Sequence, residues 1–234
     1  MREEFQRTEM LLGSESMEKL TSSHVIIYGV GGVGGYVAEA LVRSGIGEIT
    51  IVDFDKVSVS NINRQIIALH STVGKYKVDV LAERLKDINP DLIIHPLRTF
   101  FSPDNKDEFD FTKYDYVVDA IDTVTGKIEI IKCAKKANVP IISSMGAGNK
   151  LDPTKFQVAD ISKTTVCPLA RVIRQKLKEF NIKDVKVVFS TETPVKPVFE
   201  VEKENGKNPP ASCAFVPSVA GLIIVGEVIK DLIK

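Results

Sequence analysis

A glycine-rich turn between two structured segments constrains this chain more than any other feature. Residues 25–28 form a short run of apolar and aromatic side chains, rich in β-branched types, which predicts a buried strand rather than a helix. Gly29, Gly31 and Gly34 follow with Gly-x-Gly-x-x-Gly spacing, and apolar residues then recur at helical spacing over residues 35–44. A strand, this turn and a helix in that order indicate a nucleotide site, with a bare turn between strand and helix as the alternative.

The three glycines suit a bound phosphate for different physical reasons. Gly29 permits the tight turn, Gly31 lets a phosphate approach bare backbone, and Gly34 lets the helix pack closely on the sheet. The N-terminus of the following helix presents unpaired N–H groups and a partial positive charge to an anion. We therefore expect this turn to bind the phosphates of a nucleotide.

An acidic residue ends the next predicted strand, which covers residues 47–53. Asp53 lies about 20 residues after the glycines, where an acid hydrogen-bonds a ribose hydroxyl in dinucleotide-binding folds. A helix N-cap is the alternative role for this carboxylate. The glycines and Asp53 fit NAD and ATP equally well, because both ligands carry a ribose and phosphates.

The segment after this strand distinguishes between NAD and ATP as the expected ligand. Residues 53–65 place Asn61, Arg64 and Gln65 beside the carboxyl end of the predicted sheet, and Lys77 follows at the start of the next predicted helix. Hydride transfer has no need of such cations, whereas the departure of pyrophosphate from a triphosphate does. Each side chain taken alone is more often a solvated charge, but the set after this glycine turn favours ATP.

Composition narrows the class of protein. The formal net charge of zero gives no overall field toward nucleic acid or membranes, so a surface for either must be local. The first residues lack the apolar stretch of a secretory signal, and the apolar segment 214–229 is interrupted by a proline and a glutamate. Cys133, Cys167 and Cys213 form no Cys-x-x-Cys pair, which argues against a disulfide framework or a cysteine zinc site. We expect a cytoplasmic protein without a membrane span.

The remaining pattern predicts an α/β, Rossmann-like fold with a mostly parallel sheet and helices on both faces. Strands are predicted over residues 92–97, 114–122 and 140–144, the last closing the sheet, and helices over 3–12, 75–89, 125–137, 168–180 and 218–233. The chain beyond the fifth strand forms a C-terminal strand and helix extension. Residues 193–210 are predicted to be a flexible loop, in which 200–207 is the segment most expected to be disordered.

Three motifs together resemble the ThiF/MoeB/HesA superfamily, adenylating enzymes related to ubiquitin-activating enzymes. The motifs are the glycine turn at 29–34, the segment 53–65 and the sequence Thr-Val-Gly-Lys-Tyr-Lys at 72–77. The resemblance implies a homodimeric or pseudo-dimeric enzyme that transfers AMP from ATP to a carboxylate. It further implies a single adenylating domain over 1–234, with a nucleotide-binding core at 1–150 and a substrate-side extension at 151–234.

The resemblance also implies roles for individual residues. Asn61 and Arg64 match the phosphate-binding pair, Lys77 matches an essential lysine, and Arg7 matches an arginine that reaches the neighbouring subunit's nucleotide site. Asp122 matches an acid that contacts the magnesium–ATP unit, which suits a hard cation such as Mg²⁺. The predicted nucleotide site comprises Gly29, Gly31, Gly32, Gly34, Asp53, Asp55, Ser60, Asn61, Arg64, Lys77 and Asp122, with Arg7, Arg64, Lys77 and Asp122 catalytic.

The later part of the chain resembles one branch of this superfamily, the tRNA threonylcarbamoyladenosine dehydratases. The resemblance lies in residues 143–153, 160–171 and 188–192, although Cys167 stands where the branch has an acid before its proline. It implies ATP-dependent cyclisation of the threonylcarbamoyl group on a tRNA adenosine beside the anticodon, through an acyl adenylate. It also suggests a sulfurtransferase or cysteine desulfurase as a helper protein.

Three other functions remain open on the sequence. The first is adenylation of the C-terminal glycine of a ubiquitin-like sulfur carrier, whose activators often carry two Cys-x-x-Cys pairs that this chain lacks. The others are a nicotinamide-dependent oxidoreductase and a nucleotide-binding regulator without catalysis. Intramolecular attack on an acyl adenylate needs no protein nucleophile. Cys213 could be argued as an acyl acceptor, but a lone cysteine beside apolar neighbours is more often a small buried hydrophobe.

The segment 160–190 is locally basic, and Arg171, Arg174 and Lys178 fall on one face of the helix predicted at 168–180. A solvated helix face is the alternative from charge alone. Since a tRNA substrate requires phosphate contacts, the resemblance makes this face the expected tRNA-binding surface. The three histidines of the chain have no ligand-spaced partner in the sequence, so no role is predicted for them.

Overall fold

A seven-stranded sheet organises the computed structural model, which describes residues 3–199 and 209–234. The strands are β1 (His24–Tyr28), β2 (Glu48–Val52), β3 (Ile93–Leu97), β4 (Tyr116–Asp119), β5 (Ile141–Ser144), β6 (Phe156–Asp160) and β7 (Lys186–Ser190). Their order is β3-β2-β1-β4-β5-β7-β6, and only the pairing of β6 with β7 is antiparallel. The predicted α/β fold with a mostly parallel sheet is therefore confirmed, while residues 200–207, predicted to be disordered, lie outside the described residues.

The centre of the sheet is β1, which pairs with β2 on one side and β4 on the other. Val25, Ile26 and Ile27 are fully buried, as expected for a parallel strand with helices on both faces. The chain order reverses between β1 and β4, which makes their carboxyl ends the topological switch point where ligands bind in open α/β sheets.

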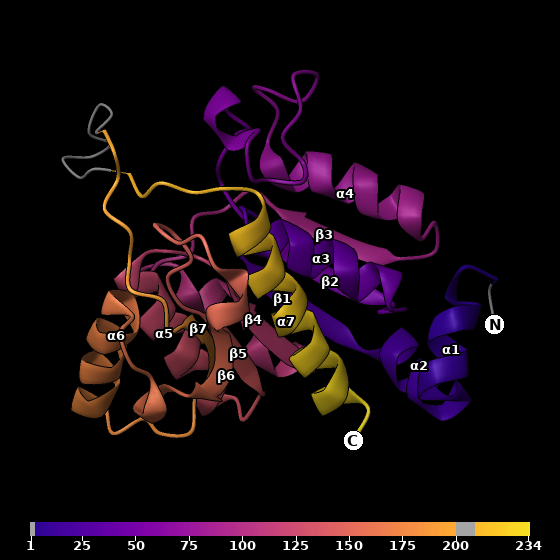
Figure 1. Cartoon of the computed structure of the whole chain (residues 1–234). Helices are drawn as coiled ribbons and strands as arrows, with labels where there is room; N and C mark the ends of the chain where they lie inside the picture. The colour runs from indigo at the N-terminus through magenta and orange to yellow at the C-terminus, as the bar shows by residue number, and fades with distance from the viewer. Residues whose placement is uncertain (1–2, 200–208) are drawn as a thin grey trace.

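Helices cover both faces of the sheet (Figure 1). The helices are α1 (Gln6–Leu12), α2 (Ser14–Ser22), α3 (Gly34–Arg43), α4 (Lys77–Ile88), α5 (Val124–Lys136), α6 (Pro168–Glu179) and α7 (Phe215–Leu232). One core cluster joins the sheet to α3, α4 and α7, and the other joins it to α5 and α6. No helix among residues 3–199 and 209–234 is long and apolar enough to cross a membrane.

Two details of the fold differ from the sequence-based expectation. The strand predicted over 114–122 ends at Asp119, so Asp122 lies in the loop before α5. The sheet also continues past β5, because β7 pairs with β5 and β6 pairs with β7. The prediction that the fifth strand closes the sheet was therefore wrong, since β7 is recruited from residues more than forty positions later in the chain.

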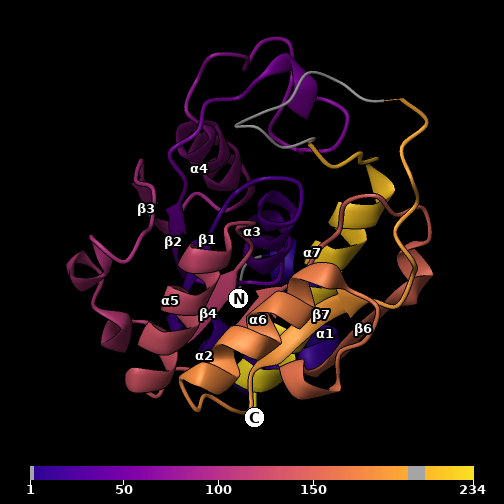
Figure 2. The same cartoon turned by 90° about the vertical axis from the view of Figure 1, so that its left-hand side faces the viewer.

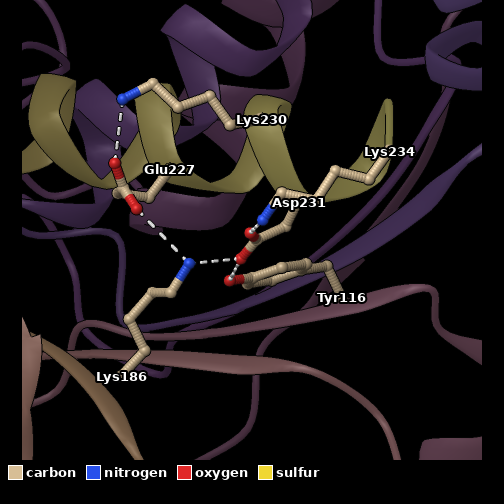
Figure 3. A network of polar contacts seen from close by, with 6 residues as sticks. All are labelled: Tyr116, Lys186, Glu227, Lys230, Asp231 and Lys234. Carbon is tan, nitrogen blue, oxygen red and sulfur yellow. Dashed lines mark hydrogen bonds and ion pairs between the residues drawn. The ribbon is translucent and has the colours of Figure 1, made fainter.

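The last helix is fastened to the sheet by the Asp231 network, the group of six polar side chains drawn in Figure 3. The Asp231 carboxylate accepts hydrogen bonds from Tyr116 Oη at 2.8 Å in β4 and from Lys186 Nζ at 2.5 Å in β7. Lys234 Nζ donates to the same carboxylate at 2.8 Å. Lys186 also pairs with Glu227 at 3.3 Å, so α7 is held to β7 through this lysine and to β4 through Tyr116.

The Asp231 network predicts a pH-dependent stability. Burial opposes ionisation of Asp231, but hydrogen bonds from Lys186, Lys234 and Tyr116 outweigh it and lower the pKa of Asp231 to about 2. Because the folded-state pKa lies below the usual 3.8, this stabilisation of about 2 kcal/mol is present above pH 3.8 and is lost as the pH falls toward 2.

Asp231→Asn should therefore lower the free energy of unfolding by about 2 kcal/mol at pH 7, with a shrinking difference from wild type below pH 4. Urea denaturation of both proteins between pH 3 and pH 7 measures this, with the exposed Asp107→Asn as control. A difference that stays constant with pH would show that the carboxylate charge contributes nothing.

Candidate nucleotide site

The glycine turn lies at the carboxyl end of the sheet, between the ends of three neighbouring strands. Gly29 N–H donates to Val52 O at 2.8 Å, which joins the turn to the end of β2. Ala120 N–H donates to Tyr28 O at 2.8 Å, which joins the end of β4 to the end of β1. Figure 2 shows the connection between β2 and α4 at the same end, at the top of the view.

The three motif glycines have different steric requirements. Gly29 has φ +85°, and a Cβ there would lie 2.9 Å from Ala120 O. A Cβ on Gly34 would lie only 1.8 Å from Gly29 O, so backbone itself blocks any side chain. At Gly31 the nearest atom to an added Cβ is Gln65 Nε2 at 3.7 Å, so the space above this backbone is open. That opening is where the motif lets a phosphate approach.

Gly32 lies between the turn and two other parts of the chain. A Cβ there would contact Pro217 in α7 at 3.4 Å and Arg64 Cγ at 3.5 Å. The first turn of α7 and the segment that contains Arg64 therefore both border the glycine turn. Asn63 Nδ2 donates to Ser212 O at 3.0 Å, which joins the Arg64 segment to the residues just before α7.

Asp53 fastens the turn to the end of β2. One carboxylate oxygen accepts the Val30 N–H at 2.9 Å, and the other accepts the Asp55 N–H at 2.9 Å. Each oxygen keeps a second lone pair that a ribose hydroxyl can use. The alternative N-cap role does not hold, because the next helical turn begins only at Val59.

Lys77 is a buried cation at the first position of α4. Its Nζ donates to Asp55 Oδ2 at 2.8 Å, and its own N–H donates to Asp55 O at 2.9 Å. The lysine side chain is 8% exposed, whereas that of Asp55 is 48% exposed. An ammonium group has three donors, so Lys77 keeps protons for an anionic ligand while Asp55 fixes its direction.

The loop that contains Arg64 is stabilised by hydrogen bonds from its own side chains. Asn61 is buried, and its Oδ1 accepts the Ser58 N–H at 3.1 Å. Arg64 Nη1 donates to Ser60 O at 2.8 Å and to Asn63 Oδ1 at 3.0 Å, which leaves other guanidinium N–H groups unused. The Ser60 hydroxyl is exposed and pairs with Ser58 Oγ at 2.9 Å. Ser60, Asn61 and Arg64 thus lie together on the turn that faces Gly32.

Two buried polar atoms beside the site have no hydrogen-bond partner among the described residues. Gln65 Oε1 is buried next to Gly31, and Thr123 Oγ1 is buried one residue after Asp122. A buried polar atom without a partner is costly, so such atoms indicate groups that a ligand or water satisfies. From the sequence, Gln65 was named only as a member of the polar segment 53–65 and Thr123 was not named, because burial without a partner is visible only in the structure.

The two acids after β4 have opposite environments. Asp122 is exposed, and no hydrogen bond or ion pair of its carboxylate is found within the described parts of the chain. Asp119 is fully buried, pairs with Lys127 Nζ at 2.9 Å and accepts a hydrogen bond from Ser143 Oγ at 2.5 Å. Asp119 therefore has a structural role, and Asp122 is the carboxylate available to a ligand. Lys127 was not singled out from the sequence.

The remaining predicted residues lie away from the glycine turn of the same chain. Arg7 is exposed on α1, which Figure 1 places far from the loops that follow β1 and β2. Arg171 and Lys178 are exposed on α6. Arg174 instead donates to Thr164 O at 2.8 Å and to Thr164 Oγ1 at 2.6 Å, so it fastens α6 to the preceding loop.

The cysteines show no feature of a nucleophile. Cys167 is buried before the first turn of α6, and its Sγ would lie 3.7 Å from a Cβ on Gly146. Cys213 is half-buried, and its nearest polar contact is Lys150 O at 3.9 Å. A small apolar side chain satisfies both positions.

Comparison with known proteins identifies the family to which the chain belongs. The ThiF family matches residues 5–234. The chain belongs to the ThiF family. Within that family it is similar to the tRNA threonylcarbamoyladenosine dehydratase of Bacillus subtilis, at 48% identity over all of this chain and 96% of that protein. The Escherichia coli enzyme of the same description is 41% identical over 84% of this chain and 76% of its own length.

Solved ThiF-family structures agree with the fold. The crystal structure of the Escherichia coli tRNA N6-threonylcarbamoyladenosine dehydratase in complex with ATP has a TM-score of 0.91 at 37% identity. The match covers 99% of this chain and 94% of that one, and the complex with AMP matches equally well. The recognition of the superfamily and of its dehydratase branch from sequence motifs is confirmed.

Proposed function

We propose that this chain is an ATP-dependent tRNA threonylcarbamoyladenosine dehydratase. The observation that carries the proposal is the open backbone at Gly31, with Arg64 bordering the same turn and the Lys77–Asp55 pair at the same end of the sheet. The similarity to dehydratases over the full length, one of them solved with ATP, supports the same activity. A single adenylating domain with a nucleotide core at 1–150 and a substrate-side extension at 151–234 is part of the proposal.

The reaction follows from the arrangement of charges. The threonyl carboxylate of the substrate attacks the α-phosphorus of ATP, and pyrophosphate leaves toward Arg64 and Lys77. An atom of the same modified side chain then attacks the acyl carbon and expels AMP, which carries away one carboxylate oxygen. One proton is released with each ring closed, so the nucleoside loses one water overall. Attack within one molecule enjoys a high effective concentration, which removes the need for a protein nucleophile.

Asp122 is the residue that would hold a Mg²⁺ ion bound with ATP. Its carboxylate is exposed at the end of the sheet where the phosphates would lie, and oxygen ligands suit this hard cation. The ion would neutralise charge on the phosphates. A cytoplasmic location belongs to the proposal on the composition of the sequence, and a sulfurtransferase or cysteine desulfurase helper belongs to it on family resemblance.

Pyrophosphate release from ATP tests the class of substrate. We expect stimulation by tRNA that carries threonylcarbamoyladenosine and none by a ubiquitin-like sulfur-carrier protein with a free C-terminal glycine. The same tRNA lacking the threonylcarbamoyl group is the matched control. Stimulation by the carrier alone would replace the dehydratase with a sulfur-carrier activator.

A homodimer in which Arg7 completes the partner's site belongs to the same proposal. Arg7 is exposed on α1 together with Met10 and Leu11, which are 82% and 83% exposed, and apolar side chains of this size are typical of covered surfaces. Mixing Arg7→Ala with Asp122→Asn protein should restore activity to roughly a quarter of wild type, because random exchange gives half mixed dimers with one intact site each. Absence of rescue, with subunit exchange confirmed by mass, would mean that Arg7 does not act across the dimer.

The exposed basic residues of α6 are the proposed tRNA surface. Arg171→Glu combined with Lys178→Glu should weaken tRNA binding and reduce the dependence of log Kd on log salt by roughly one for each lost phosphate contact. Arg174 is left intact because its hydrogen bonds to Thr164 hold the fold. The matched control reverses Lys86 and Lys113, exposed lysines outside α6. Equal effects of the two pairs would indicate a general charge effect and place the docking surface elsewhere.

A further inference from the structure

Two histidines and a glutamate without a predicted role meet on one face of the sheet. His24 and Glu48 are the first residues of β1 and β2 and lie in register with each other. His95 lies on the edge strand β3, in register with Thr50. Since side chains alternate along a strand, this register places all three on the same face at the amino end of the sheet. We call them the His24–Glu48–His95 cluster.

The donor atoms of the cluster converge on one point. Glu48 Oε1 lies 3.3 Å from His24 Nδ1 and 2.8 Å from His95 Nε2. One ligand atom from each residue lies within 4.8 Å of the other two. Four-coordinate Zn²⁺ has bonds of about 2.0–2.1 Å, which places its ligand atoms roughly 3.3 Å apart. Small side-chain rotations therefore bring the three atoms to zinc-binding distances.

The surroundings orient His24 as a metal ligand. Its Nε2 is hydrogen-bonded to Thr50 Oγ1 at 2.9 Å, which leaves Nδ1 as the nitrogen that faces Glu48. A ring whose second nitrogen is held by a polar group is the usual arrangement around bound metals. Tyr114 packs edge-on against the His24 ring at 4.8 Å and restricts it further.

The cluster is partly open to solvent. The side chains of His24, Glu48 and His95 are 16%, 32% and 46% exposed, so an ion can enter from solvent and keep a water ligand.

We propose that the His24–Glu48–His95 cluster binds one Zn²⁺ ion and thereby clamps the edge strand β3 to β1 and β2. Two imidazoles and one carboxylate, without a thiolate, are a typical zinc ligand set, and nitrogen donors disfavour Mg²⁺ and Ca²⁺. The glycine turn follows the opposite end of β1, so this ion would not touch the nucleotide. The inference does not depend on the proposed dehydratase activity.

Equilibrium dialysis of the metal-stripped, untagged full chain against Zn²⁺ tests the proposal. Wild type should hold about one ion per chain, while His95→Ala and the isosteric Glu48→Gln should lose it. His70→Ala removes the remaining histidine of the chain, an exposed loop residue, and should retain the ion. At a hundredfold excess over Kd, Zn²⁺ should raise the Tm of wild type by about 5–10 °C and leave that of His95→Ala unchanged.

The three cysteines are the alternative ligands for a bound metal ion. The absorption spectrum of Co²⁺ distinguishes cysteine coordination from binding in the His24–Glu48–His95 cluster. Co²⁺ in the cluster should give only weak visible absorption, whereas thiolate coordination adds intense near-ultraviolet charge-transfer bands. Full zinc binding by His95→Ala, thiolate bands in wild type, or no binding by wild type would each overturn the proposal. Circular dichroism of the metal-free variants confirms that a lost ion does not reflect a lost fold.

Discussion

Asp122→Asn is expected to fold as wild type does and to lose ATP-dependent turnover by roughly a hundredfold or more. The substitution replaces an exposed carboxylate without a protein partner, so stability should change by less than about 0.5 kcal/mol. The loss of activity is large because a neutral amide holds a divalent cation poorly against the triphosphate, and one electrostatic contact to the reacting group is typically worth that factor. Pyrophosphate release at saturating tRNA measures the effect.

The control for this variant is Asp104→Asn, which makes the same change at an exposed carboxylate in the loop between β3 and β4. It should leave both activity and stability unchanged. Normal turnover of Asp122→Asn at low and high Mg²⁺ would remove this residue from the site. Restoration of its activity by raised Mg²⁺ would locate the defect in ion binding.

Gly34→Ala is expected to destabilise the protein by about 3 kcal/mol or more. The added methyl carbon would lie 1.8 Å from Gly29 O, and the obstacle is backbone in the turn itself rather than a side chain that can rotate away. Relief requires that α3 move away from the sheet, which opens the buried core between them. Chemical denaturation measures the loss, and Gly226→Ala is the control, because a Cβ there meets no atom within 4 Å.

In the same turn, Gly31→Ala distinguishes an effect on ligand binding from an effect on folding. Its added carbon has 3.7 Å to the nearest atom, so the variant should be as stable as wild type. It should bind ATP at least tenfold more weakly, because the methyl group occupies the approach of the phosphate to the backbone. Unchanged ATP affinity of Gly31→Ala would show that the phosphates lie elsewhere.

Local motifs in the sequence indicated most of the residues of the candidate nucleotide site. The glycine turn, Asp53 and the segment with Arg64 depend on short-range geometry, since a strand, a turn and a helix position them within a few residues. The partners of neighbouring side chains needed tertiary information. Asp119 and Asp122 are three residues apart, and only the structure shows that Asp119 is buried against Lys127 while Asp122 is exposed.

The features missed from the sequence depend on contacts between distant segments. Strand β6 was not predicted, because its central residues are exposed and its partner strand β7 lies beyond an intervening helix. Arg174 shares a helical face with Arg171, but its bonds to Thr164 depend on how the preceding loop folds back. The His24–Glu48–His95 cluster is set by strand register, which the spacing of histidines along the chain does not reveal.

The mass of the modified nucleoside is a direct test of the proposed dehydratase activity. Purified protein would be incubated with ATP, Mg²⁺ and tRNA that carries threonylcarbamoyladenosine, and the tRNA would then be digested under mild conditions for mass spectrometry. We expect a nucleoside lighter by one water, formed only with ATP and absent with Asp122→Asn. An unchanged nucleoside after ATP has been converted to AMP and pyrophosphate in the same tube would contradict it.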